Sequence, residues 1–148
     1  MPNGIRLGVT LMGGSLSIEG RLDILDLLTR YCLSFDAGDV ESCLDCFTLN
    51  GVWETPTVRK SARDEMRHKL LDAARRPSHR HFVTNVLISP VAGQSTMARA
   101  TSAYLYIESV NGNFTLKSVG RYEDELVKED DGKWRLARRR VLKEMPSD

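Results

Sequence analysis

Residues 77–89 read PSHRHFVTNVLIS, and within this stretch the spacing of the apolar residues changes. Before Pro77, apolar residues recur every three to four positions, as they do on one face of a helix. From residue 81 to residue 89 the pattern fits a period of two, which is typical of a strand with one buried face. One face of this predicted strand carries His81, Val83, Asn85 and Leu87.

Three helices are predicted before Pro77. The first covers about residues 18–37, because apolar residues recur there at helical spacing. A second, short helix capped by Asp39 is expected to run through Phe47, and a third is expected to begin at Ser61 with a capping box. The apolar face of the first helix carries Ile24, Leu28, Tyr31 and Phe35.

Three further strands are predicted after the first, over residues 96–109, 117–129 and 134–141. Turn-forming residues separate them, of which Asn111-Gly112 is the strongest hairpin signal. Helices followed by an antiparallel meander indicate an α+β fold, in which the helices cover one face of a curved sheet.

The chain has 148 residues, which fits one domain; a flexible arm is predicted over residues 1–17 and a single domain over residues 18–148. The 21 Lys and Arg residues nearly balance the 20 Asp and Glu residues, whereas a nucleic-acid-binding protein usually has a strong basic excess. No apolar run is long enough to span a membrane. We therefore expect a globular protein that binds neither nucleic acid nor membrane.

Three cysteines, Cys32, Cys43 and Cys46, are present. An odd number, with no signal peptide, predicts reduced thiols in a cytoplasmic protein. The Cys43-x-x-Cys46 pair lacks the second pair that a zinc site needs, so thiols packed between helices are expected instead.

Asp36 and His81 are the residues best suited to chemistry. An acid at the end of a helix meets an unfavourable dipole, so Asp36 is an odd choice for stability alone. Histidine exchanges protons near neutral pH, which suits His81 to acid–base catalysis. Each could instead be structural, as a solvated helix end and a hydrogen-bonded strand residue. A metal site built from Asp36, His81 and His79 is a further alternative, although His79 is expected in a loop.

Other polar residues could complete a site. A tyrosine in an apolar pocket can stabilise a developing oxyanion, and it can equally pack in a core. Asn85 could position His81 or bind a ligand. The basic cluster near the C-terminus is expected to be a solvated strand face with one arginine turned inward. The candidate tyrosines are Tyr31, Tyr104 and Tyr106.

Several segments together resemble SnoaL-like proteins of the nuclear transport factor 2-like superfamily. They are YCLSFDAGD at residues 31–39, Phe47, GVW at 51–53, HFVTN at 81–85, GRYEDEL at 120–126 and DGKWRLARR at 131–139. The resemblance covers the chain from about Ile18 to Val141. It implies a cone-shaped, curved antiparallel sheet with three N-terminal helices that enclose a pocket.

The branches that the chain resembles most are scytalone dehydratase and hexachlorocyclohexane dehydrochlorinase, which carry out eliminations with an Asp–His dyad. The resemblance places this dyad on Asp36 and His81, a family tyrosine on Tyr31, and a late-strand arginine on Arg139. By strict alternation Arg139 faces away from Trp134 unless the strand bulges. Tyr106 stands where the dehydratases have a second acid or base, which leaves it as a possible proton donor.

The resemblance thus implies a cofactor-independent lyase or isomerase, without a metal, that acts on a small cyclic hydrophobic substrate. The alternatives are a non-catalytic ligand-binding protein, a polyketide cyclase and an oxygenase small subunit. A homo-oligomer, either a dimer or a trimer, is also implied. The catalytic residues would be Asp36, His81 and Tyr31, and the substrate-binding residues Phe35, Trp53, Val83, Asn85, Tyr104, Tyr106 and Arg139.

Overall fold

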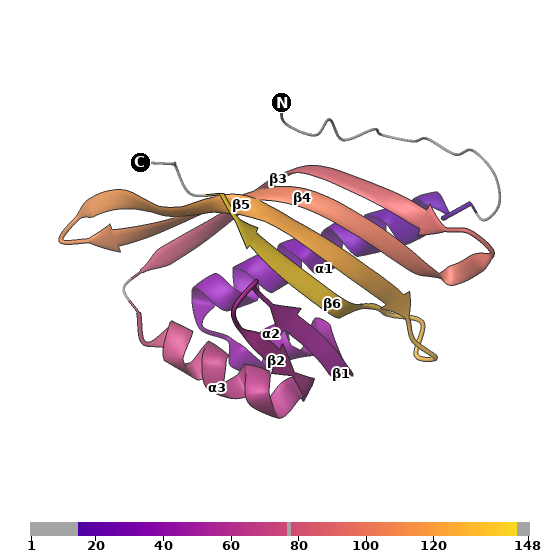
Figure 1. Ribbon diagram of the computed structural model, residues 1–148, viewed down its shortest axis with the longest axis horizontal. Coiled ribbons are helices and arrows are strands. Elements are labelled where there is room, and N and C mark those ends of the chain that lie inside the picture. Colours follow the sequence, from indigo (N-terminus) through magenta and orange to yellow (C-terminus); the bar gives the residue numbers. More distant parts are fainter. Residues whose placement is uncertain (1–14, 77, 145–148) are drawn as a thin grey trace.

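The computed structural model describes residues 15–76 and 78–144, so most of the arm predicted over residues 1–17 lies outside the described residues. Figure 1 shows α1 lying across one face of a curved, unclosed sheet, with α2, α3, β1 and β2 gathered below it. The α+β fold class is confirmed. The elements are α1 (Ile18–Ala37), α2 (Val40–Asp45), β1 (Phe47–Glu54), β2 (Arg59–Ser61), α3 (Ala62–Ala74), β3 (His79–Val91), β4 (Gln94–Val110), β5 (Asn113–Lys128) and β6 (Trp134–Lys143).

The described strands form one sheet in the order β2-β1-β6-β5-β4-β3. Four of its five strand pairings are antiparallel, but β1 pairs with β6 in parallel, which the meander pattern did not predict. Phe47, expected at the end of a helix, instead begins β1 and lies opposite Leu136. The reason is tertiary: α2 ends at Asp45, and the buried Phe47 ring belongs to the core under the sheet.

The helix ends follow from local hydrogen bonds. The Ser17 hydroxyl accepts from the Gly20 N–H at 3.0 Å and caps α1, which ends at Gly38 with φ of 70°. At α3 the expected capping box is altered. The Ser61 side chain makes no cap bond, and the Glu65 carboxylate accepts from the Ser61 backbone N–H at 2.6 Å. No helix in the described part of the chain is long and apolar enough to cross a membrane.

A β-bulge in β3 corrects the predicted facing of that strand. The register with β4 shifts between Thr84 and Leu87, and Asn85 adopts φ of 53°. The extra residue reverses the alternation, so Val86 packs against the core while Asn85 and Leu87 are exposed. Asn85 therefore does not share the inner face of His81.

A second bulge, in β6, turns Arg139 inward. Leu136 lies opposite Leu126 and Arg138 opposite Glu125, so Ala137 is the extra residue. The alternation reverses there, and Arg139 is completely buried on the inner face beside Trp53 of β1. The expectation of one inward arginine in the basic cluster is met by this residue, and Arg135 is buried as well.

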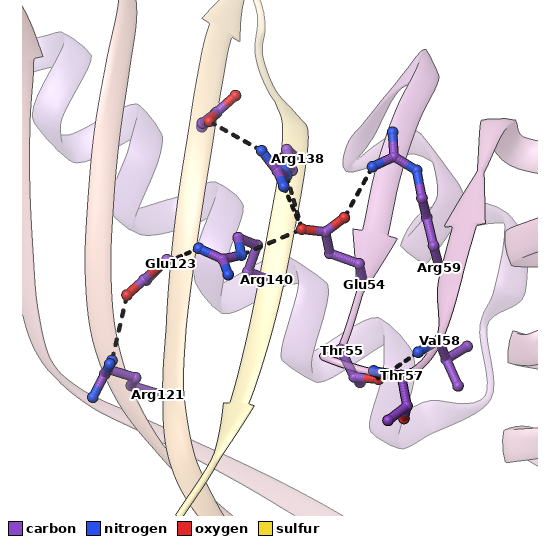
Figure 2. Close-up of polar contacts among 10 residues, drawn as sticks. Glu54, Thr55, Thr57, Val58, Arg59, Arg121, Glu123, Arg138 and Arg140 are labelled. Carbon is purple, nitrogen blue, oxygen red and sulfur yellow. Dashed lines mark hydrogen bonds and ion pairs between the residues drawn. The ribbon is translucent and has the colours of Figure 1, made fainter.

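Arg138 and Arg140 flank Arg139 and lie on the opposite face of β6. Figure 2 shows both of them directed toward Glu54 at the end of β1, with Arg59 of β2 on its other side. The Glu54 carboxylate accepts from Arg138 at 2.5 Å and from Arg59 at 3.0 Å, and Arg140 lies 3.3 Å away. These ion pairs join three neighbouring strands across the parallel β1–β6 seam.

On the inner face, Arg139 forms a bidentate ion pair with Asp124 of β5. Its Nε and Nη2 donate to the two carboxylate oxygens at 2.8 and 2.7 Å, and both side chains are fully buried. The guanidinium carbon lies 4.3 Å from the ring centre of Tyr31 and 4.1 Å from that of Tyr122. The nearby Asp124 carboxylate keeps the pKa of Arg139 well above its usual range, although burial acts in the opposite direction.

We predict that Asp124→Leu lowers the free energy of unfolding by about 3–5 kcal/mol, because it leaves the buried guanidinium without its counter-ion. The double variant Asp124→Leu/Arg139→Met removes both charges and should be clearly more stable than the single variant. Urea denaturation followed by circular dichroism measures both. A single variant as stable as the double would contradict this account of the core.

Candidate active site

Asp36 and His81 meet at the C-terminal end of α1 and the start of β3. The Oδ1 atom of Asp36 lies 2.6 Å from Nδ1 of His81, and its Oδ2 atom accepts from the His81 backbone N–H at 2.8 Å. The side chains are 6 % and 9 % exposed. Both carboxylate oxygens thus bind one residue and hold its ring in a single orientation.

This contact determines which imidazole nitrogen is available for chemistry. An ionised carboxylate can only accept hydrogen bonds, so Nδ1 of His81 carries the hydrogen that Asp36 accepts. In the neutral imidazole Nε2 is then the unprotonated nitrogen, which is the one able to take a proton.

Aromatic rings surround the His81 imidazole. The Phe35 ring lies 4.8 Å from it in an edge arrangement, and the Tyr106 ring, opposite His81 in the β3–β4 register, also lies 4.8 Å away. His79, expected in a loop, is instead the first residue of β3 and is buried. Its Nε2 lies 3.4 Å from the Phe35 carbonyl oxygen and 3.9 Å from Asp36 Oδ1.

Within residues 15–76 and 78–144, no three His, Cys, Asp or Glu side chains are grouped as metal ligands. Cys32, Cys43 and Cys46 are buried free thiols, as expected of cysteines packed between helices. Burial raises the pKa of Cys32 and Cys46 to about 11 and that of Cys43 to about 12, so all three are protonated at neutral pH.

The three candidate tyrosines lie in different surroundings. Tyr31 is buried, which raises its pKa well above 10, and its ring lies 6.0 Å from that of Phe35. Tyr104 is also buried, and its hydroxyl and that of Ser118 are 2.9 Å apart. Tyr106 donates its hydroxyl to Glu108 at 3.0 Å, and its pKa is raised to about 12, chiefly by burial. The hydrogen of the Tyr106 hydroxyl is therefore already engaged in the hydrogen bond to Glu108.

The remaining predicted lining residues divide into two groups. Trp53 and Val83 pack partly buried against the core on the inner face, and Arg139 lies there in its ion pair with Asp124. Asn85 is exposed at the bulge, where its side-chain oxygen accepts from the Thr84 hydroxyl at 3.5 Å. The structure thus brings Asp36, His81, Phe35 and Tyr106 together and leaves Asn85 outside this group.

Two small hollows, one among the three helices and one between α1, α3 and β1, have empty volumes of about 160 and 180 Å³, which include open solvent. Sites for drug-sized ligands usually measure roughly 300–1,000 Å³. Each of these hollows has free space of only about 10 Å³, which holds about one water molecule, so an organic ligand enters neither without side-chain movement. His81 lines neither of them. The smaller is lined by residues of α1, α2 and α3, and the larger by Tyr31, Phe47, Trp53, Met66, Lys69 and Leu70.

The family model of the SnoaL-like domain matches residues 17–140 of this sequence. The chain belongs to the SnoaL-like family. A search among curated proteins finds no match to it.

Solved structures of other proteins share this fold. A variant of Rv3472 from Mycobacterium tuberculosis, a protein of unknown function, is 30 % identical over 84 % of this chain and 71 % of its own, with a TM-score of 0.78. An NTF2-like protein with a cystatin-like fold from Novosphingobium aromaticivorans is 20 % identical over 87 % and 84 %, with a TM-score of 0.78. A protein from the same organism, provisionally named a scytalone dehydratase, is 22 % identical over 84 % of each chain, with a TM-score of 0.75. The likeness to the last two shows the fold alone.

Lys69 of this SnoaL-like protein is a candidate that sequence reasoning missed. Its Nζ lies 3.9 Å from the ring centre of Trp53 and 5.0 Å from that of Phe35, and burial lowers its pKa to about 8. A signal was present in the sequence. Lys69 follows Met66 by three positions and so borders the buried face of α3.

We predict that nitrogen NMR of the His81 imidazole finds the Nδ1–H form in the neutral ring, because Asp36 accepts from Nδ1. Asp36→Asn removes the carboxylate and should weaken this preference, whereas His68, which is exposed on α3, serves as the internal reference in both proteins. A wild-type ring protonated on Nε2 would contradict the assigned hydrogen bond.

We also predict that Lys69→Met raises the free energy of unfolding at pH 7 by about 1–2 kcal/mol, after allowing for the lost contact with Trp53. The native pKa of about 8 lies below the ordinary 10.5, so between these values the unfolded chain binds more protons and wild-type stability rises with pH. The advantage of the variant should therefore be complete below about pH 8 and shrink toward pH 10.5. Urea denaturation at several pH values measures it, and an advantage independent of pH would refute this cause.

Proposed function

We propose that this protein is a cofactor-independent lyase or isomerase in which His81 removes a proton from carbon of a small cyclic hydrophobic substrate. The observation that carries this proposal is the double contact of the Asp36 carboxylate with His81, at 2.6 Å to Nδ1 and 2.8 Å to the backbone N–H. A carboxylate so placed orients a general base and stabilises the imidazolium that it becomes.

In an elimination, Nε2 of His81 takes the proton, and the C–H electron pair forms a double bond to the neighbouring carbon. The leaving group departs from that neighbouring carbon with its own bonding pair. A leaving hydroxide takes the proton back from the imidazolium and departs as water, whereas a leaving halide departs as the anion and the proton passes to solvent. An isomerase would instead return the proton to another carbon of the same molecule.

The rings of Phe35 and Tyr106 flank the imidazole and supply apolar surface for such a substrate. The Tyr31 ring lies 6.0 Å from that of Phe35, and we propose Tyr31 as the donor to an oxyanion. Membership of the SnoaL-like family, and a fold shared with a protein provisionally named a scytalone dehydratase, support this role, although one fold can carry many functions.

A second function, non-catalytic binding of a small ligand or support of a partner subunit, is favoured by a different observation. The two hollows are small, and His81 lines neither of them. An oxygenase small subunit would be such a supporting subunit. A polyketide cyclase would be an enzyme and is a separate alternative. The predicted homo-oligomer and cytoplasmic location remain proposals, compatible with either function.

The deciding experiment is a screen of cyclic hydroxy-ketones and cyclic halides for elimination, followed by kinetics of variants on the compound that reacts. His81→Ala is expected to lower kcat by roughly 100- to 10,000-fold, because it removes the general base. Asp36→Asn should lower kcat less than His81→Ala does, since the imidazole itself remains.

His68→Ala is the matched control, because His68 is an exposed histidine on α3 and should keep full activity. Circular dichroism of each variant shows whether it is folded. Full turnover by a folded His81→Ala protein would overturn the proposal, and a wild-type protein that binds these compounds without converting them would favour the binding function.

A further inference from the structure

The face of the sheet that points away from the helices carries an apolar patch. Figure 1 shows α1 on one face of the sheet with α2 and α3 gathered below it, so no helix of the described chain covers the other face. Large apolar side chains are nevertheless exposed there, among them Phe114 at 74 % and Phe82 at 54 %. The outer patch consists of Phe82, Leu105, Ile107, Phe114, Leu116 and Val119.

The strand register makes the outer patch contiguous. Phe82 lies opposite Leu105, which lies opposite Val119, so these three residues form one row across β3, β4 and β5. Ile107 and Leu116 form the next row. Side chains directly opposite each other have Cβ atoms about 4.5–5.5 Å apart. Single exposed apolar residues are ordinary on a protein surface, whereas a contiguous patch marks a site of interaction.

Ion pairs border the outer patch, and their charges balance. Arg121 of β5 lies 3.4 Å from Glu123 and 3.2 Å from Glu144. Arg140 of β6 lies 3.1 Å from Glu123, and Figure 2 shows Glu123 between the two arginines. Two arginines and two glutamates therefore form this rim, so it neither repels a second copy of the chain nor selects a partner of opposite charge. An apolar centre with a polar rim is the usual anatomy of a protein interface.

The free edge of β5 is protected against pairing with another strand. β6 pairs with β5 from Gly120 onward, so residues 113–118 have a strand on one side only. The register with β4 shifts between Tyr106 and Ile107, which makes Lys117 an extra residue in this segment. A bulge and an exposed lysine are both features that oppose pairing at a strand edge. Two copies would therefore meet through the faces of their sheets and not through these edges.

The size of the outer face suits a dimer of this chain. Strands lie about 4.8 Å apart and residues about 3.3 Å apart along them, so the outer face of β3 to β6 measures roughly 700 Å². A stable interface buries about 800 Å² on each partner. The patch and its rim together are therefore close to the area that a stable dimer needs.

We propose that this protein is a two-fold symmetric homodimer in which the outer faces of two sheets pack together, with the outer patch of each copy against that of the other. A two-fold interface brings the same surface of both subunits together, and an apolar patch with a balanced rim is complementary to itself. Phe82 follows His81 on β3, and Leu105 precedes Tyr106 on β4. The second copy thus supports, from behind, the strands that carry the candidate active site. This inference is independent of the chemistry proposed at His81.

The test is sedimentation equilibrium of the full chain over roughly 1–100 μM protein. The wild type should have twice the chain mass of 16.6 kDa. Leu105→Glu, at the centre of the outer patch, should raise the dissociation constant of the dimer at least ~100-fold, because each dimer would bury two unpaired carboxylates. Leu116→Glu should act in the same direction. Leu33→Glu is the matched control, because Leu33 is an exposed leucine on α1, and it should leave the dimer intact.

A mixing experiment separates a lost interface from a damaged fold. Leu105→Lys should also be monomeric, and an equimolar mixture of Leu105→Glu and Leu105→Lys should form dimers, because opposite charges then face each other across the interface. Circular dichroism shows whether each variant is folded. A monomeric or trimeric wild type, folded patch variants that dimerise as wild type does, or loss of the dimer in Leu33→Glu would each overturn the proposal. None of these measurements requires turnover, so a protein without lyase activity would still test it.

Discussion

The buried ion pair between Arg139 and Asp124 is the constraint on which the rest of the inner face depends. Removing two charges from water costs several kcal/mol each, and only close, well-aligned contacts recover that cost. The bidentate contact meets this requirement, and the rings of Tyr31 and Tyr122 pack against the guanidinium. The positions of α1, β5 and β6 are tied together at this point.

The β6 bulge makes this arrangement possible. Ala137 reverses the alternation of the strand, so that Arg139 enters the core while Arg138 and Arg140 remain on the other face and bind Glu54. The arginine run therefore serves two purposes at once: one side chain is part of the polar core, and its neighbours hold the parallel β1–β6 seam (Figure 2).

Three charged or titratable groups on the inner side are satisfied to different degrees. Asp124 neutralises the charge of Arg139, although the buried Nη1 of Arg139 makes no hydrogen bond in the described part of the chain, and Asp36 binds both the ring and the backbone of His81. Lys69 has aromatic faces and no anion beside it. Because the two hollows each have free space for about one water molecule, a larger ligand requires side-chain movement.

Local signals in the sequence determined the elements. Helical spacing and Gly38 predicted the observed bounds of α1, Asp39 predicted the cap of α2, and the change of period after Pro77 predicted the long strands. These features depend on neighbours within a few residues, so they can be read along the chain. The pairing of Asp36 with His81, 45 residues apart, followed from the family resemblance, because no spacing rule spans that separation.

Only the tertiary structure decided the facing of the residues beyond each bulge. A strand read with strict alternation puts Asn85 inside and Arg139 outside, and a single extra residue reverses both. A bulge residue disrupts the ladder of hydrogen bonds locally. It is tolerated where burial and ion pairing across strands offset that cost, and those energies depend on partners that are distant in sequence. The same reason explains Lys69 of α3, whose amine lies over the rings of Trp53 and Phe35 from other elements. Sequence alone determined most of the helices and strands and the chemical groups available, whereas the packing of distant segments decided where α2 gives way to β1 and which of those groups meet.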